Sequence, residues 1–151
     1  MLRGNGPLEC TMQEVEKLFV LHKAAQRLRL YAELQRYNSA LRTVVGQPFR
    51  QWIDGSFISA QPLPNDLDLV SFLPYEAVKG RLDQLVGFYQ LNLAYAGLEA
   101  YLVLQHLASD SRYFLSRADE GYWNDLFRKT RPNRFGQAHT KAFMEILVEA
   151  P

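Results

Sequence analysis

The chain has little cysteine, no long apolar run and almost no net charge, and each shortage excludes a class of protein. Its single cysteine, Cys10, excludes an internal disulfide framework and a zinc site built from several cysteines, so we predict no functional role for Cys10. No apolar run approaches the roughly twenty residues of a membrane span, and the N-terminus lacks the basic-then-apolar order of a secretory signal. We therefore expect a cytoplasmic protein without a membrane partner.

The net charge of +1 is unevenly distributed along the chain. Residues 22–50 carry six Lys/Arg and one acid, residues 51–111 carry two Lys/Arg and seven acids, and residues 112–141 carry seven Lys/Arg and three acids. An acidic centre between basic segments suits an anionic metal–nucleotide complex, although solvated helix faces produce similar blocks. The overall balance is too weak to predict nucleic-acid binding.

A chain of 151 residues, 48% hydrophobic and 13% aromatic, is long enough for one well-filled domain. We predict an irregular N-terminal arm over residues 1–10 and a single domain over residues 11–151. Periodicity and caps predict helices and strands in a mixed order. The expected helices are 11–21, 24–45, 75–89 and 111–129; the expected strands are 49–57, 66–73, 98–104 and an edge strand at 142–148. This pattern indicates an α+β fold, a small mixed sheet that carries acids on one face and is covered by helices on the other.

The most informative motif is Trp52-Ile53-Asp54-Gly55-Ser56, nine residues, then Asp66-Leu67-Asp68. Side chains alternate along a strand, so Asp66 and Asp68 share a face, and two neighbouring carboxylates need a counter-charge such as a divalent cation. Gly55 allows close backbone approach, and Ser56 offers a hydroxyl beside an amide, as a phosphate requires. The alternative interpretation is an ordinary hairpin in which an Asn-Asp pair only forms a turn.

This arrangement resembles the signature of the DNA polymerase β-like nucleotidyltransferase superfamily, in particular its short, stand-alone bacterial members. Further similarity extends from the segment Gly4 to Pro7 through a late Trp123 to the strand entry at 141–143, and so spans most of the chain. The resemblance implies a nucleotidyltransferase-type sheet in which Gly55 and Ser56 contact the triphosphate. It also implies that Asp66 and Asp68 hold Mg²⁺ or Mn²⁺.

The same resemblance makes Glu99 the third acid, which would bind the catalytic metal and help deprotonate the attacking hydroxyl. Alternation within residues 98–104 places Glu99 opposite Leu98 and Leu102, whereas the competing interpretation is a solvated residue at a sheet edge. The superfamily more often has aspartate at this position, and glutamate reaches one methylene further.

Other charged residues have less defined roles. Arg131, Arg134 and Lys141 could fold over a triphosphate, but solvation is the commoner state of such side chains. Asp54 is expected to point away from the metal face and to be structural. The three histidines have no metal-ligand spacing.

The resulting functional prediction is a magnesium-dependent nucleotidyltransferase that moves a nucleoside monophosphate from ATP or another triphosphate to a hydroxyl. The acceptor (a protein, an RNA end or a small molecule) is not specified by the sequence. Short relatives that act on or bind toxins imply a toxin–antitoxin or phage-defence setting and a toxin-like partner, by analogy alone. The alternative is a catalytically weak module of the same fold that acts by binding a partner protein.

Overall fold

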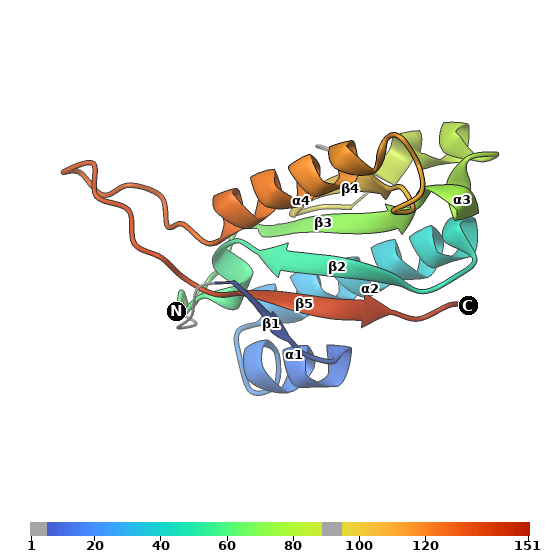
Figure 1. Cartoon of the computed structure of the whole chain (residues 1–151). Coiled ribbons are helices and arrows are strands. Elements are labelled where there is room, and N and C mark those ends of the chain that lie inside the picture. The colour runs from blue at the N-terminus through green and yellow to red at the C-terminus, as the bar shows by residue number, and fades with distance from the viewer. Residues whose placement is uncertain (1–5, 89–94) are drawn as a thin grey trace.

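The structure is a computed structural model that describes residues 6–88 and 95–151. Its centre is a five-stranded mixed sheet with the order β1-β5-β2-β3-β4 (Figure 1). The strands are β1 Pro7–Glu9, β2 Phe49–Asp54, β3 Leu67–Pro74, β4 Leu98–Gln105 and β5 Phe143–Val148. Strand β2 runs antiparallel to both β3 and β5, whereas β3 with β4 and β1 with β5 are parallel pairs. The expected α+β class with a mixed sheet is confirmed.

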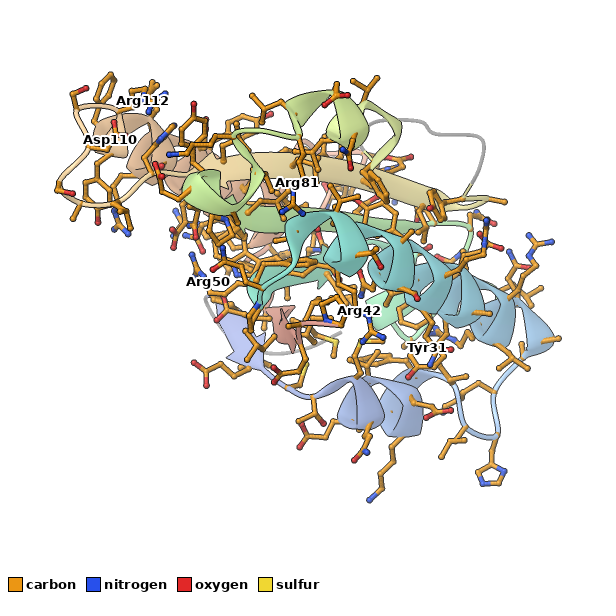
Figure 2. The ribbon with its side chains drawn as sticks, turned by 90° about the vertical axis from the view of Figure 1, so that its right-hand side faces the viewer. Tyr31, Arg42, Arg50, Arg81, Asp110 and Arg112 are labelled. Atoms are coloured by element: carbon orange, nitrogen blue, oxygen red, sulfur yellow. The ribbon has the colours of Figure 1, made fainter. Side chains whose placement is uncertain are left out.

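Helices α1 (Met12–Phe19) and α2 (Ala25–Val45) lie where the sequence predicts them, although α1 ends two residues before the expected residue 21. Thr11 and Glu14 form a complete capping box at the start of α1. Helix α2 ends at Gly46, whose φ of 74° is the left-handed conformation typical of a glycine after a helix. Arg81 also donates to the carbonyl of Val44 at 2.7 Å, near the C-terminus of α2 (Figure 2).

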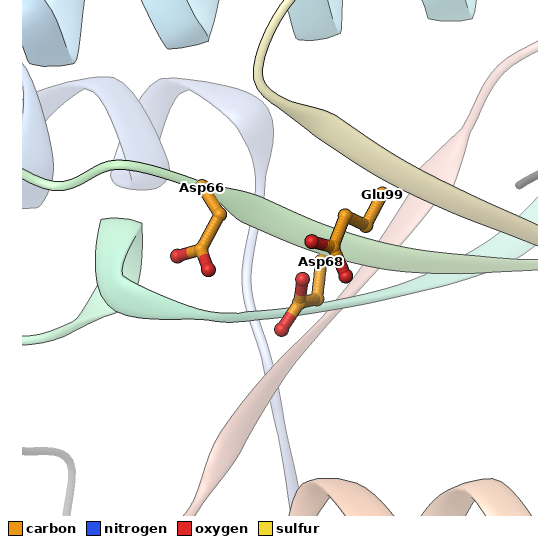
Figure 3. A group of neighbouring side chains, drawn as sticks. All are labelled: Asp66, Asp68 and Glu99. Atoms are coloured by element: carbon orange, nitrogen blue, oxygen red, sulfur yellow. The ribbon is translucent and has the colours of Figure 1, made fainter. Parts of the chain in front are cut away.

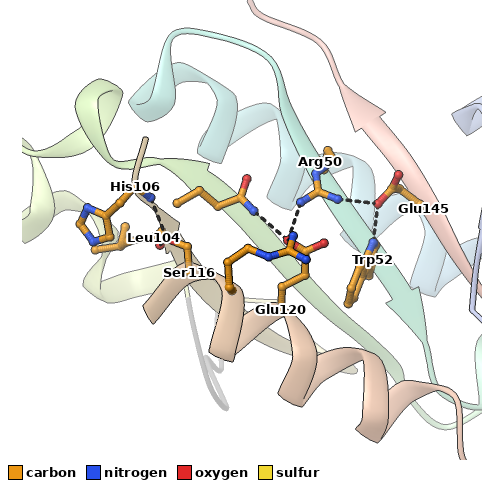
Figure 4. A network of polar contacts seen from close by, with 9 residues as sticks. Arg50, Trp52, Leu104, His106, Ser116, Glu120 and Glu145 are labelled. Carbon is orange, nitrogen blue, oxygen red and sulfur yellow. Dashed lines mark hydrogen bonds and ion pairs between the residues drawn. The ribbon is translucent and has the colours of Figure 1, made fainter. Parts of the chain in front are cut away.

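Helix α2 packs on one sheet face and α4 (Tyr113–Phe127) packs on the other. Trp123 of α4 lies 4.5 Å from Tyr101 of β4, and Phe127 lies 5.7 Å from Phe143 of β5, measured between ring centroids. Arg50 of β2 joins Glu120 of α4 at 3.1 Å and Glu145 of β5 at 3.2 Å (Figure 4). Tyr101 shares its sheet face with Glu99, so α4 covers part of the acid-bearing face, which we expected to be free of helices.

Four assignments differ from the prediction. The strand expected over 49–57 ends at Asp54, and Ser56–Ile58 form a short 3₁₀ segment instead. The single helix expected over 75–89 is a short α3 (Tyr75–Val78) followed by a 3₁₀ segment, Leu82–Phe88, with Gly80 between them; residue 89 lies outside the described residues. Strand β5 is not an edge strand but lies between β1 and β2, consistent with its nearly continuous apolar sequence. Within the predicted irregular arm, Pro7–Glu9 form strand β1.

Among the helices of residues 6–88 and 95–151, none combines the length and apolarity needed to cross a membrane.

Candidate metal and phosphate site

A row of carboxylates crosses three strands at one end of the sheet. Asp54 of β2 pairs directly with Asp68 of β3, and Asp68 pairs directly with Glu99 of β4. Directly opposed residues point to the same face, so these three acids are neighbours. The expectation that Asp54 points away from the metal face is therefore wrong. The alternation of side chains along one strand does not reveal the register between two strands. That register decides whether Asp54 lies on the same face as Asp68.

Asp66, Asp68 and Glu99 form a compact group of possible metal ligands (Figure 3). One carboxylate oxygen from each lies within 4.8 Å of the others, and all three residues are partly buried. A cluster of carboxylate oxygens suits hard cations such as Mg²⁺, Mn²⁺ or Ca²⁺. The structure thus brings together the three acids that the sequence singled out.

Asp68 is the least satisfied member of this group. Burial, together with the charges of Asp66, Glu99 and Asp54, raises the pKa of Asp68 to about 7. Its Oδ1 is buried and has no hydrogen-bond partner in the described part of the chain. Buried polar atoms almost always have a partner, so this oxygen fits a site for a cation.

Ser56 and Asp66 are hydrogen-bonded to each other. The Ser56 amide donates to Asp66 Oδ1 at 2.9 Å, and the Ser56 hydroxyl donates to the same oxygen. Burial opposes ionisation of Asp66, but these two hydrogen bonds and the charge of Arg131 together hold the pKa of Asp66 below its usual range. The turn therefore recognises an anionic oxygen, here that of Asp66.

Gly55 permits this arrangement because of its conformation and its close contacts. Its φ is 87°, and a Cβ atom would lie 2.9 Å from the Asp68 amide nitrogen and 3.3 Å from the Asp66 carbonyl oxygen. Any other residue would be strained and would push β2 away from the start of β3. The direct effect of Gly55 is thus to position the acids, and its contact with a phosphate stays a prediction.

The turn after Ser56 is held by Arg27 of α2, a residue that the sequence analysis did not single out. Arg27 is only 3% exposed, and its guanidinium donates to the carbonyls of Phe57, Ser59 and Gln61. Such a fork can bridge several carbonyls at once. No local signal distinguishes Arg27 from the other arginines of α2, since its partners lie about thirty residues later.

Of the three cations weighed in the sequence, Lys141 is the one that is built into the site. Its ammonium pairs with Asp54, and the two side chains are 16% and 8% exposed. Arg131 and Arg134 are exposed, but the charge of Arg131 acts on both Asp66 and Asp68. Lys141 therefore neutralises one end of the carboxylate row, while Asp68 and Glu99 remain without such a direct partner among the described residues.

Comparison with known proteins assigns a family without an activity. A model of DUF6932, described as a family of unknown function, matches residues 2–147, which include the whole carboxylate row. No curated protein and no solved structure matches the chain.

Proposed function

We propose that this chain, which belongs to the DUF6932 family of unknown function, is a metal-dependent nucleotidyltransferase. It would transfer a nucleoside monophosphate from ATP or another triphosphate to a hydroxyl group. The observation that carries the proposal is the buried, unpartnered oxygen of Asp68 between Asp66 and Glu99, directly beside the Gly55-Ser56 turn.

The energetic cost of the cluster supports a functional interpretation. An aspartate pKa of about 7 in place of about 4 corresponds to at most about 4 kcal/mol of lost stability above neutral pH, at 1.36 kcal/mol per unit. An amide or an apolar side chain at position 68 would avoid this cost. Strongly perturbed groups of this kind concentrate at functional sites, where the charge itself is required.

The proposed reaction uses the donors and acceptors of the site. The oxygen of the acceptor hydroxyl forms a bond to the α-phosphorus, the bond from that phosphorus to the bridging oxygen breaks, and pyrophosphate leaves. A divalent ion held by the carboxylates of Asp66, Asp68 and Glu99 would supply the positive charge that neutralises the triphosphate. Glu99 is our candidate to receive the hydroxyl proton.

Ser56 would contribute its amide and hydroxyl to a phosphate oxygen. These two donors now bond Asp66, so the proposal requires Asp66 to exchange them for the cation. Because both the phosphate and Asp66 are anionic, the same turn can serve either one.

The proposal is tested with α-labelled triphosphates, Mg²⁺ and an extract of the source cells. Wild-type protein should label an acceptor, and Glu99→Gln should be at least tenfold slower, because glutamine keeps the shape but not the charge. Glu149→Gln, an exposed substitution after β5, is the matched control and should leave the rate unchanged. If Glu99→Gln is as fast as wild type, the third acid has been misassigned.

A second candidate is supported by the exposed surface of α4. Phe114, Leu115, Tyr122 and Leu126 are 66%, 44%, 61% and 50% exposed. Exposed apolar side chains grouped on one helix suit a protein partner, such as a toxin-like protein. If triphosphate binds but no acceptor is ever labelled, a partner-binding module becomes the better description.

A further inference from the structure

We propose that residues 128–141, here called the basic arm, bind a single-stranded nucleic-acid end and deliver its terminal hydroxyl to the carboxylate cluster. The binding part of this inference stands by itself, and the delivery part rests on the proposed function. The arm connects the end of α4 to the start of β5 and projects away from the sheet (Figure 1).

The basic arm carries charge of one sign. It contains five Lys/Arg (Arg128, Lys129, Arg131, Arg134 and Lys141) and one histidine, with no Asp or Glu in its fourteen residues. The near-neutral total for the whole chain conceals this segment, which is why composition gave no indication of nucleic-acid binding. A run of positive charge attracts a phosphodiester backbone by releasing its condensed counterions.

The basic arm has internal order, so its charges are presented in a definite arrangement. Lys129 and Thr140 form a β-bridge, and the Thr130 amide donates to the His139 carbonyl at 2.8 Å. At the tip, the Asn133 side-chain oxygen accepts from the amides of Phe135 and Gln137 at 2.9 Å and 3.0 Å. The arm is therefore a hairpin with a capped tip.

The tip combines an aromatic ring with a guanidinium. Phe135 is 72% exposed, and the guanidinium carbon of Arg134 lies 4.8 Å from the centre of its ring. A solvent-exposed ring beside a guanidinium offers a stacking surface to an unpaired base, whereas the carboxylates of an acidic peptide would engage only the cation. This feature favours single-stranded nucleic acid over an acidic protein as the ligand.

The root of the basic arm meets the carboxylate row. Lys141 pairs with Asp54, and the charge of Arg131 acts on Asp66 and Asp68. The six residue-to-residue steps from Lys129 to Phe135 can span at most about 20 Å when extended. A strand bound along the arm would thus have its terminal hydroxyl near the acids and its phosphates on the cations.

The test is fluorescence anisotropy of the full-length protein with labelled single-stranded RNA and DNA oligonucleotides over a range of salt concentrations. Arg131→Gln with Arg134→Gln should weaken binding and reduce the slope of log affinity against log salt by about 1.4, at about 0.7 per lost phosphate contact. Phe135→Ala should weaken binding about tenfold and leave the salt slope unchanged. Comparison of the RNA and DNA oligonucleotides identifies which of the two nucleic acids is preferred.

Matched controls separate the basic arm from general charge. Lys17→Gln with Arg29→Gln removes two exposed cations on α1 and α2, and Leu28→Ala removes an exposed apolar group; both should bind as wild type does. Equal binding by the arm variants and wild type would overturn the inference. So would a polyglutamate peptide that binds as tightly as the oligonucleotides, since it would indicate an acidic protein ligand.

The outcomes also distinguish this inference from the proposed function. Label transfer to a small hydroxyl compound without oligonucleotide binding would overturn the basic arm's role and leave the transferase intact. Oligonucleotide binding without any label transfer would retain the binding role and contradict the transferase. An oligonucleotide with a blocked 3′ hydroxyl should bind normally and remain unlabelled, and labelling of it would overturn delivery of that hydroxyl.

Discussion

Two pairs of polar residues on the same two strands show how differently the two faces of this sheet are built. Gln51 of β2 pairs directly with Ser71 of β3, and three residues further along β2, Asp54 pairs with Asp68. Gln51 and Ser71 face α2, and both are 0% exposed. Asp54 and Asp68 lie on the opposite face, at the end of the sheet beside the basic arm.

The neutral pair is fully satisfied by its neighbours. Gln51 accepts from the Asn38 side-chain amide at 3.0 Å and donates to Asn38 Oδ1 at 2.9 Å and to the Ser71 hydroxyl at 2.8 Å. Amides and hydroxyls both donate and accept, so they can satisfy one another, whereas ionised carboxylates only accept. The carboxylate row therefore needs cations, and Lys141 supplies a direct one to Asp54 alone. Buried polar side chains therefore indicate a ligand site only where the chain itself supplies too few partners for them.

The largest effect expected from this contrast is the pH dependence of stability. The folded-state pKa of Asp68, about 7, lies above its unfolded value, so folding favours the protonated carboxyl. The stability that this protonated form contributes is fully present below about pH 4 and is lost as the pH rises to about 7. Urea unfolding of metal-free protein should show a loss of at most about 4 kcal/mol over this range. Asp68→Asn should remove most of that slope, and Asp83→Asn, at an exposed site, should not. An unchanged slope in Asp68→Asn would show that Asp68 is not the group responsible.

The second effect is stabilisation by ligand. Mg²⁺ or Mn²⁺ with a nucleoside triphosphate should raise the melting temperature, since a ligand at one hundred times its Kd stabilises the folded state by about 2.7 kcal/mol. The double variant Asp66→Asn with Asp68→Asn should lose this response while folding normally. Absence of any shift in the wild type at millimolar ligand would contradict an intact site.

The third effect distinguishes triphosphate binding from metal binding. Ser56→Ala removes a hydroxyl that would donate to a charged phosphate, so titration calorimetry should show triphosphate affinity weakened by about 1.5–3 kcal/mol. Mn²⁺ alone should bind Ser56→Ala nearly as well as it binds wild type. If both ligands are lost equally, the serine serves only to hold Asp66 and the turn.

The smallest effect concerns the neutral pair. Ser71→Ala deletes one uncharged hydrogen bond from Gln51 and should cost about 0.5–1.5 kcal/mol of unfolding free energy. It should leave the metal and triphosphate responses unchanged. A reduced ligand response in Ser71→Ala would contradict this expectation and show that the two faces of the sheet are coupled.

Sequence reasoning succeeded where one strand or helix determined the outcome. Alternation correctly put Asp66 and Asp68 on one face, and capping chemistry predicted α1 and the end of α2. It failed where the answer depends on pairing between distant segments. The side of Asp54 and the interior position of β5 both follow from register and strand order.

The contacts of Arg27 and Lys141 illustrate the same limit. Arg27 binds carbonyls about thirty residues away, and Lys141 binds a carboxylate 87 residues away. A buried cation has no local signature that separates it from an exposed one, because its burial depends on partners elsewhere in the chain. Residue type and spacing could therefore select Asp66, Asp68 and Glu99, but they could not separate Lys141 from the exposed arginines near it or find Arg27.

The central claim is that Asp66, Asp68 and Glu99 hold a divalent cation beside a triphosphate. It is tested most directly by a crystal structure with Mn²⁺ and a non-hydrolysable ATP analogue, with data collected at the manganese absorption edge. We expect an anomalous peak coordinated by oxygens of these three carboxylates, with a phosphate oxygen on the Ser56 amide and hydroxyl. A manganese peak away from these residues, or a triphosphate bound elsewhere with the Ser56–Asp66 hydrogen bonds intact, would contradict the claim.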